Sequence, residues 1–593
     1  MPIRVPAIAM TALSALVIVV ASLLLPTFYV TLAGYIGLAT LVALGLVLLT
    51  GICGQTSFGQ ASFVGLAAYA TALLTKFAAA PPIVGLLAGL VVTGAIAWLL
   101  GLITARLSGH FLALVSVAWG ISFFSLFGTL PALHGFNGIG EIPPLTLGPF
   151  TAANQRINLA IILIAVAIVM AMSSNLLDSR VGRAMRTLNG ARLMGESLGI
   201  DTVRLSRQVF VIAALYAALS GFLFAHFQRF ISPTPFGLGA SIDYLFMVII
   251  GGAEWLWGAP IGAFLVVVLR DQFNDWIPRL TGRTGDFEAL VFSLAVIVLL
   301  QRAPEGLLPL IIRLKHKPRQ ATASPQQLPD ESPPSLRFAA SGTELLVLDS
   351  VSRYFGGLAA NRDVSFAVHD AEIVALIGPN GAGKTTLFNI ISGVLPPSSG
   401  TVSLFGAPSA HLSPHRIAAM GLARTFQHVR LLGRRSVLDN VALGAHLSGH
   451  AGFLRCMLRL DRAEEATLLK RARAHASRLG LDAVLDTPAG DLPLGQQRVV
   501  EIARALCLHP RLLLLDEPAA GLRLAEKQRL ASLLRQLRAE GMGVLLVEHD
   551  MDFVMGLADR VVVMEFGEKI AEGPPDRVQS DPVVLEAYLG AVA

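Results

Sequence analysis

The feature that most constrains this chain is a long N-terminal stretch that is almost free of charge. Between Val5 and Gly140 there is no Asp or Glu, and Lys76 and Arg106 are the only Lys or Arg residues. Because a soluble domain carries about a quarter charged residues, this stretch belongs in a lipid bilayer. From Glu344 onward the charge density is ordinary for a soluble domain. The 593 residues therefore divide into a membrane half and a soluble half.

Apolar stretches recur along the membrane half at about the ~20 residues that a spanning helix needs. The N-terminal one is interpreted as a retained membrane helix and not as a signal peptide, because the apolar character continues beyond it. The predicted spans are centred on Ala7–Phe28, Thr31–Leu49, Phe58–Leu74, Ile83–Leu102, Leu112–Leu130, Leu159–Met172, Val209–Phe227, Ile242–Leu269 and Ala289–Gln301.

The soluble half alternates apolar strands with helical patterns, which is typical of an α/β domain with a largely parallel sheet. A segment rich in Pro, Gln, Ser and Ala precedes it and is predicted to be an extended linker. We therefore predict a membrane domain at residues 1–314, the linker at 315–343 and the α/β domain at 344–593. The strands are expected at Leu345–Leu348, Ile373–Ile377, Leu512–Leu515 and Gly543–Val547.

A glycine-rich turn follows the second of these strands and leads directly into a helical pattern. In such a turn the backbone N–H groups point inward around phosphate oxygens, and the helix N-terminus favours negative charge. Lys384 is expected to reach the β- and γ-phosphates, and the Thr385 hydroxyl is expected to hold Mg²⁺. The sequence therefore predicts ATP and Mg²⁺ as cofactors, with ATP held by Gly378, Pro379, Asn380, Gly381, Ala382, Gly383, Lys384, Thr385 and Thr386.

Two acids follow the run of leucines that forms the third predicted strand. Asp516 would stand at the C-terminal edge of that strand, where a carboxylate can hold Mg²⁺ through water. Glu517 is next and is predicted to orient and deprotonate the attacking water. Such a pair is often only the end of a strand, but beside a phosphate-binding turn the catalytic interpretation is favoured.

The topology of the membrane half follows from its basic residues. The stretch Ser179–Arg207 holds six arginines against two acids and is therefore predicted to be cytoplasmic. A nucleotide-binding half must lie on the same side, so an even number of crossings separates the two. The apolar segment Ile242–Leu269 is broken by glycines and a proline. We predict that it makes two crossings, which gives about ten helices in an all-α domain; one crossing plus a re-entrant piece is the alternative.

Further motifs of the soluble half are specific to one family. They are Arg424-Thr-Phe-Gln427, Leu492-Pro-Leu-Gly-Gln-Gln-Arg498, Asp516-Glu-Pro-Ala-Ala-Gly-Leu522, Glu548-His-Asp-Met551 and Ala587-Tyr-Leu-Gly590. With them, residues 344–590 resemble the ATPases of ABC transporters, in particular those of branched-chain amino acid importers. The resemblance implies that Gln427 senses Mg²⁺ and the attacking water and that His549 contacts the γ-phosphate. It also implies that Phe355, or alternatively Tyr354, stacks on adenine.

The resemblance assigns the ABC signature to one short segment, which contacts ATP bound to a second subunit. The usual sequence is Leu-Ser-Gly-Gly-Gln, and here Pro and Leu replace the Ser and the first Gly. Arg523 stands where the family usually has Asn or Asp, in a loop that crosses the subunit interface. These departures affect the partner's ATP site and not this chain's own. The segment consists of Leu492, Pro493, Leu494, Gly495 and Gln496.

The membrane half resembles the permeases of the same importers between Thr31 and about Leu310. The residues that carry this are Gly54-Gln-Thr-Ser-Phe-Gly-Gln-Ala-Ser-Phe63, Ser179–Arg186, Met194–Asp201 and Ile250–Gly262. The resemblance implies that Ser179–Asp201 docks into a groove on the ATPase near Gln427. The alternative is a basic loop held at lipid headgroups.

Polar residues inside apolar segments leave their roles open at this point. Gln55, Ser57, Gln60 and their neighbours either cap and pack a helix, which is favoured, or line a pore. Asp243 and Glu254 are acids at or inside apolar stretches, and each is equally consistent with a functional site and an interface.

Both resemblances imply one machine, in which ATP drives uptake of leucine, isoleucine, valine or related small solutes across the bacterial inner membrane. Urea, short amides or another amino acid are alternative cargoes. An exporter half-transporter would carry long charged helices between its spans, and a regulator on a membrane anchor would need only one or two spans. The expected partners are a second permease, a second ATPase, an extracytoplasmic solute-binding protein and membrane lipid.

The remaining composition excludes other classes of function. No interleaving of basic and aromatic residues suggests a nucleic-acid partner. The three cysteines, Cys53, Cys456 and Cys507, are scattered and have neither disulfide nor metal-ligand spacing.

Overall fold

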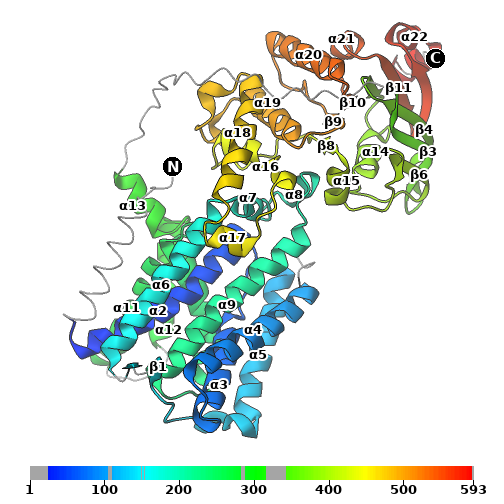
Figure 1. Cartoon of the computed structure of the whole chain (residues 1–593). Coiled ribbons are helices and arrows are strands. Elements are labelled where there is room, and N and C mark those ends of the chain that lie inside the picture. Colours follow the sequence, from blue (N-terminus) through cyan, green and yellow to red (C-terminus); the bar gives the residue numbers. More distant parts are fainter. Residues whose placement is uncertain are drawn as a thin grey trace.

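The computed structural model describes residues 25–104, 110–147, 150–152, 154–281, 287–315 and 342–589. Most of the first predicted span, Ala7–Phe28, and most of the predicted linker lie outside these ranges. In Figure 1 a bundle of long helices lies below an α/β half, and the helices labelled α7, α8 and α17 stand where the two meet.

In its described residues the membrane half is helical, with a small hairpin of strands β1 (Leu145–Leu147) and β2 (Phe150–Ala152). Helix α2 continues into a π-helical turn, Val47–Ile52, and α3 into another, Leu73–Phe77. The α-helices are α2 (Thr27–Leu46), α3 (Gln60–Ala72), α4 (Pro82–Thr104), α5 (His110–Thr129), α6 (Gln155–Leu177), α7 (Arg180–Thr187), α8 (Arg192–Ser197), α9 (Thr202–Gln228), α10 (Leu238–Gly251), α11 (Gly258–Thr281), α12 (Phe287–Arg302) and α13 (Leu307–Lys315).

Five helices of the described residues are long and apolar enough to cross a membrane by length and composition. They are α2 with its π-helical turn, α4, α5, α6 and α9. The predicted spans in α3, α10, α11 and α12 are also helical, but these helices are shorter or more polar. The all-α membrane domain is thus as predicted, with spans of unequal length.

The broken apolar segment forms two helices, α10 and α11, of which α10 has 14 residues and is shorter than the candidate spans. An ideal Cβ on Gly251 would lie 1.9 Å from the carbonyl oxygen of Gly258, and one on Gly262 would lie 1.7 Å from that of Met247. This register makes α10 and α11 an antiparallel pair whose backbones touch, which glycine permits. Asp243 of α10 pairs with Arg270 of α11, so that acid serves an interface between helices.

The polar side chains around the start of α3 differ in their surroundings. Ser57 accepts a hydrogen bond from the Gly59 N–H at 3.4 Å, and Ser62 donates one to the Gly120 carbonyl of α5 at 3.4 Å. Gln60 is buried, and its side-chain amide has no hydrogen-bond partner among the described residues. The two serines therefore cap and pack the helix, whereas Gln55 lines a cavity that is described below.

The soluble half contains two sheets, and the larger one is largely parallel as predicted. It has the order β12-β11-β5-β10-β9-β8, in which only β12 is antiparallel to its neighbour. The smaller sheet is antiparallel with the order β4-β3-β6-β7. The strands are β3 (Glu344–Phe355), β4 (Leu358–His369), β5 (Ile373–Ile377), β6 (Ser399–Leu404), β7 (Ala407–Pro408), β8 (Leu422–Arg424), β9 (Leu512–Asp516), β10 (Gly543–Val547), β11 (Arg560–Glu565) and β12 (Glu568–Gly573).

The central strands are buried along their whole length because helices and the second sheet cover both faces. The helices of this half are α14 (Lys384–Ile391), α15 (Pro414–Met420), α16 (Val437–Leu443), α17 (Phe453–Met457), α18 (Arg462–Arg478), α19 (Leu494–Leu506), α20 (Leu524–Ala539), α21 (Met551–Met555), α22 (Pro575–Gln579) and α23 (Pro582–Leu589).

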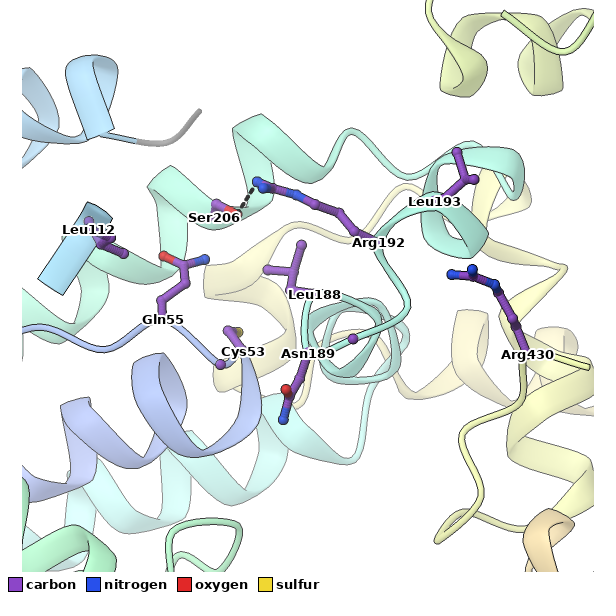
Figure 2. A pocket seen from close by; sticks show the side chains of 11 residues that line it. Cys53, Gln55, Leu112, Leu188, Asn189, Arg192, Leu193, Ser206 and Arg430 are labelled. Atoms are coloured by element: carbon purple, nitrogen blue, oxygen red, sulfur yellow. Dashed lines mark hydrogen bonds between the residues drawn. The ribbon is translucent and has the colours of Figure 1, made fainter. Parts of the chain in front are cut away.

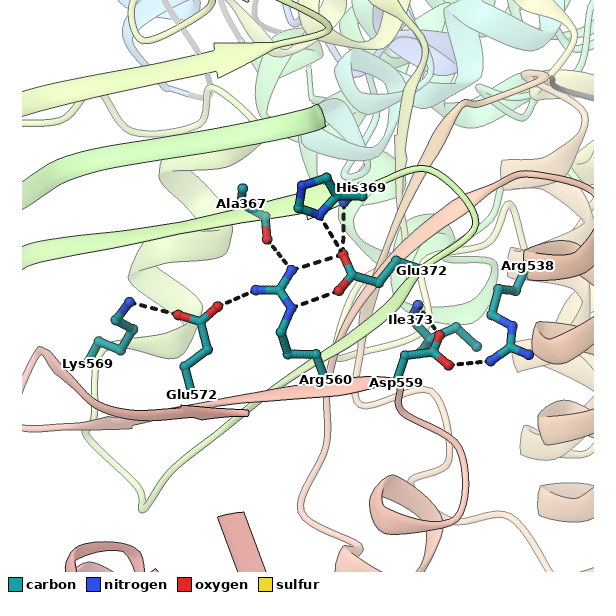
Figure 3. A network of polar contacts seen from close by, with 9 residues as sticks. All are labelled: Ala367, His369, Glu372, Ile373, Arg538, Asp559, Arg560, Lys569 and Glu572. Carbon is teal, nitrogen blue, oxygen red and sulfur yellow. Dashed lines mark hydrogen bonds and ion pairs between the residues drawn. The ribbon is translucent and has the colours of Figure 1, made fainter. Parts of the chain in front are cut away.

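A polar network ties the two sheets together (Figure 3). Arg560 at the start of β11 donates to both carboxylate oxygens of Glu372, at 2.7 and 2.9 Å, and to the Ala367 carbonyl of β4 at 2.7 Å. Burial alone would raise the pKa of Glu372, but the hydrogen bonds from Arg560 and His369 lower it. Glu372 is thus held ionised between the sheets.

Candidate functional site

The glycine-rich turn connects β5 to α14, as the sequence predicted. Gly381 and Gly383 adopt left-handed φ angles of 86° and 93°, which a residue with a Cβ rarely adopts. The Lys384 ammonium donates to the carbonyls of Gly378 and Pro379 at 2.6 and 2.9 Å. The Asn361 amide donates to the Gly383 carbonyl at 3.2 Å and so holds the turn against β4.

A cavity of about 440 Å³ lies over this turn, a size that suits a small-molecule ligand. Eleven of the predicted site residues line it, namely Phe355, Asn380, Gly381, Ala382, Gly383, Lys384, Thr385, Thr386, Gln427, Glu517 and His549. Tyr354 is not among the lining residues, so of the two aromatic candidates Phe355 is the one that faces the cavity. The guanidinium of Arg353 lies 4.8 Å from the Phe355 ring centre.

Two side chains bond to one carboxylate oxygen of Glu517 on the wall of this cavity. The Gln427 amide donates to Oε1 of Glu517 at 3.0 Å, and Nε2 of His549 lies 3.1 Å from the same oxygen. The three residues follow three different strands, β8, β9 and β10, which are neighbours at one edge of the sheet. Two of the predicted catalytic residues, Gln427 and His549, therefore contact the third, Glu517.

Asp516 directly precedes Glu517 in the chain and is almost fully buried, with 3% of its surface exposed. Burial raises the pKa of its carboxyl, and Arg424, at 3.5 Å, partly opposes the rise. Burial also lowers the pKa of the Lys384 ammonium, while Glu517 and Asp516 act in the other direction. The positive charges of Lys384 and Arg424 are therefore opposed by the carboxylates of Asp516 and Glu517 around the turn.

The residues predicted to hold Mg²⁺ fit such an ion by their chemistry. The Thr385 hydroxyl, the Gln427 amide and the Asp516 carboxylate offer hard oxygen donors, which Mg²⁺ prefers. Thr385 and Gln427 line the cavity, and Asp516 ends the strand beside it.

The signature segment does not line this cavity. Pro493 precedes the first turn of α19, without a side-chain cap, and Leu494 is 51% exposed. Leu494 also packs near Gly521, in the loop that holds Arg523. The segment therefore faces outward, which agrees with the implied role at a second subunit's nucleotide.

Sequence reasoning missed part of the cavity wall. Leu358, Ala359 and Ala360 of β4 and Val547 of β10 also line it. Apolar residues carry no chemical signal. The pairing of β3 with β4 brings the three β4 residues to the site, and Val547 reaches it as the last residue of β10. Arg424 was quoted only as part of a motif, although its charge lies next to Asp516.

The loop Ser179–Asp201 forms α7 and α8, and both contact the soluble half (Figure 1). Arg183 makes a two-pronged ion pair with Glu465 of α18, including a 3.0 Å hydrogen bond between Nη2 and Oε2. Arg180 donates to the carbonyls of His446 and Ala451 at 2.7 and 3.0 Å. The docking that the resemblance implied is therefore present, and these arginines do not point to headgroups.

Apolar residues complete this docking surface. Met185, Met194 and Leu198 of the loop belong to one buried cluster with Phe426 and Met457 of the ATPase half. Burial and the nearby charges of Arg180 and Arg183 lower the pKa of His446 to about 3. That histidine is uncharged at neutral pH and does not oppose the two arginines.

Two residues of this loop face in different directions. The Glu196 carboxylate accepts a hydrogen bond from the Thr202 hydroxyl at 2.5 Å, within the membrane half. Gly199 does face the ATPase, because an ideal Cβ there would lie 2.5 Å from Leu447. Helix propensity alone could not distinguish these two directions.

A second contact joins the halves at the turns between α10 and α11 and between α12 and α13. The guanidinium of Arg434 pairs with Glu254 at 2.8 Å and with Glu305 at 2.9 Å. Glu254 therefore lies at an interface, which was one of its two possible roles.

The chain was compared with known protein families and with curated and solved proteins. Residues 28–301 match the family described as the permease component of branched-chain amino acid transport systems. Residues 361–520 match the ABC transporter family, and residues 568–593 match a segment described as belonging to branched-chain amino acid ATP-binding cassette transporters.

Curated relatives point the same way. The chain is 41% identical over 249 residues to the high-affinity branched-chain amino acid transport ATP-binding protein LivG of Salmonella typhimurium, covering 42% of this chain and 98% of that protein. LivG of Escherichia coli K12 is 40% identical, and BraF of Pseudomonas aeruginosa is 39% identical, each with the same coverage. This chain belongs to the branched-chain amino acid ABC transporter family.

Among solved structures, a nucleotide-free ATP-binding cassette from an ABC transporter is 32% identical and is covered completely, over 42% of this chain, with a TM-score of 0.38. Family membership makes this chain an integral membrane protein with an ATPase domain, in which ATP hydrolysis is coupled to transport. The permease and the ATPase match two separate families, and in this chain they are fused into one polypeptide.

Proposed function

We propose that this transporter imports leucine, isoleucine and valine across the bacterial inner membrane at the expense of ATP, with its ATPase half in the cytoplasm. The observation that carries the proposal is agreement between two independent halves. The permease family and the relatives of the ATPase are both described by the same class of cargo. Two unrelated domains rarely share such a description unless they act together.

We assign the site residues by what each can do at its position. Backbone N–H groups of Gly381 to Thr386 and the Lys384 ammonium bind the phosphates of ATP. Glu517 accepts a proton from the attacking water, while Gln427 and His549, both bonded to its carboxylate, hold that carboxylate in place. Mg²⁺, held by Thr385, Gln427 and Asp516, would supply charge neutralisation of the phosphates.

The chain is half of the proposed machine. It holds one permease and one ATPase, and its signature segment faces outward from its own cavity. We therefore propose a second permease, a second ATPase and an extracytoplasmic solute-binding protein as partners. Because Pro493 and Arg523 depart from the family pattern, the second ATPase is proposed to be a different chain.

The cargo is tested by uptake. Proteoliposomes that contain this chain, its partner subunits and the cognate binding protein should accumulate labelled L-leucine only with internal ATP. Unlabelled isoleucine and valine should compete, whereas urea and acetamide should not. Uptake of urea without competition by leucine would overturn the cargo assignment and leave ATP-driven import intact.

The catalytic assignment is tested by two substitutions. K384A should weaken ATP binding, because the ammonium that contacts the phosphates is removed. E517Q should bind ATP but lose hydrolysis, by about 10²-fold or more if it is the general base, and should trap a closed dimer. Hydrolysis at the wild-type rate in E517Q would remove Glu517 from this role.

A further inference from the structure

A second cavity, of about 380 Å³, lies where the cytoplasmic ends of the membrane helices meet the ATPase half (Figure 2). Cys53, Gly54 and Gln55 follow α2, Leu112 belongs to α5 and Ser206 to α9. Leu188, Asn189 and Gly190 lie between α7 and α8. Helix α8 contributes Arg192 and Leu193 to the lining. Arg430, between β8 and α16, comes from the ATPase half, so this wall is built by both halves.

The lining of this cavity is basic. Arg192 and Arg430 both reach it, and none of the described residues that line it is Asp or Glu. Figure 2 shows Arg192 extending across to Ser206, to which its guanidinium donates at 3.2 Å, with Gln55 beside them and Arg430 entering from the ATPase. A guanidinium group suits a carboxylate ligand, because arginine binds carboxylates through paired hydrogen bonds, and the exposed Arg430 side chain offers such a group at this wall.

The rest of the lining suits the other parts of an aliphatic amino acid. The side-chain oxygens of Gln55 and Asn189 are acceptors for an ammonium group. Leu112, Leu188 and Leu193 offer an apolar wall for an aliphatic side chain. The main-chain N–H and carbonyl of Arg430 bond Glu501 and Arg504, which positions the residue while its exposed side chain extends toward the cavity.

We propose that this cavity binds an aliphatic amino acid through its carboxylate on the cytoplasmic side of the permease. The inference rests on the proposed cargo and deepens it by naming a product-side site. Because Arg430 belongs to the ATPase and Arg192 to the loop that docks on it, occupancy is linked to the contact between the halves. Cytoplasmic amino acid therefore holds the docked arrangement and slows further turnover.

The direct test is binding of labelled L-leucine to the full-length chain in lipid nanodiscs, without the binding protein. R430A should weaken binding about tenfold or more, the effect of losing a charge-assisted hydrogen bond, and R192Q should act in the same direction. R473A is the matched control, because Arg473 is an exposed arginine of α18 outside the cavity. Leucinamide, which lacks the carboxylate, should compete poorly. ATP binding by each variant checks that it is folded.

Three results would overturn the proposal: no leucine binding to the wild type, equal binding by R430A and R473A, or equal competition by leucinamide. The uptake assay reads the cargo separately. If the chain imports leucine but does not bind it at this cavity, only the cavity proposal fails. If the chain binds leucine through Arg430 but does not import it, only the cargo proposal fails.

The linkage to turnover has its own readout. Hydrolysis stimulated by the loaded binding protein should fall when L-leucine is added on the ATPase side, and this inhibition should be absent in R430A. Inhibition of equal depth in R430A and in the wild type would show that leucine acts elsewhere.

Discussion

Two of the contacts between the halves use the same chemistry in different surroundings. In the docking surface of α7 and α8, Arg183 and Glu465 are only 4% and 7% exposed. In the other contact, Arg434 is 62% exposed and its partners Glu254 and Glu305 are 47% and 34% exposed. Water and salt screen the exposed pairs, but a buried charge that loses its partner has no such compensation. We therefore expect the buried contact to carry more of the coupling between the halves.

The largest effect is expected when one partner of the buried pair is removed. R183A or E465A leaves a buried charge unpaired, at a cost of about 3–5 kcal/mol. We expect uptake to collapse while basal hydrolysis persists, because the ATP cavity is formed by other residues. Uptake and hydrolysis measured in the same vesicles test this.

The double variant R183M/E465L is the control for that prediction. An apolar pair of similar size is often neutral or stabilising in place of a buried ion pair, so coupling should return. If R183A alone transports normally, or if the double variant is as defective as the single ones, the buried pair does not carry the coupling.

Gly199 tests whether shape matters at the same surface. Its φ is 83°, so any side chain costs about 1–2 kcal/mol in backbone strain, and a Cβ would also overlap Leu447. G199A should therefore reduce coupled uptake, and L447A added to it should restore part of the loss, because only the overlap is relieved. Complete restoration would mean that the backbone conformation is unimportant there.

An ion pair of intermediate burial lies inside the ATPase half and provides a third point for relating burial to the effect of a substitution. Arg560 and Glu372 are 20% and 17% exposed, and the pKa of Glu372 is lowered. A lowered folded-state pKa contributes stability that is present above the unfolded pKa and is lost as the pH falls through the folded one. E372Q should lose about 1–3 kcal/mol at neutral pH, and less in acid.

Proteolysis-monitored unfolding of the full chain at several pH values measures this difference. The exposed pair Arg362–Glu568, at 55% and 49%, supplies the control E568Q, which should change little. An E372Q effect that grows as the pH falls would contradict the assigned sign.

The smallest effect is expected at Arg434. R434A removes two exposed pairs, each contributing at most about 1 kcal/mol, and should lower coupling slightly at low salt and not at all at high salt. A loss as large as that of R183A, or one that salt does not change, would reverse the ranking of the two contacts.

The ATP cavity could be predicted from the sequence to a greater extent than these contacts. The phosphate-binding turn is continuous, and Glu517 and His549 follow predicted strands of a parallel sheet, which share one edge. The strand before Gln427, β8, was not predicted, and the roles of Gln427 and His549 came from the resemblance. Arg183 and Glu465 are separated by 282 residues, and no periodicity pairs them. Glu196 and Gly199 lie in one short loop yet face opposite halves, which only the packing decides. The cavity around Arg192 and Arg430 likewise depends on the docking.

The docking of α7 and α8 has a further consequence, because both sides of the surface belong to one chain. Covalent linkage makes the contact unimolecular, so that the second surface is always present at a finite effective concentration. An ATPase that releases the membrane domain during turnover therefore recombines with the same permease and is not lost to the cytoplasm. A weakened contact would lower the fraction of time spent docked without changing the composition of the complex.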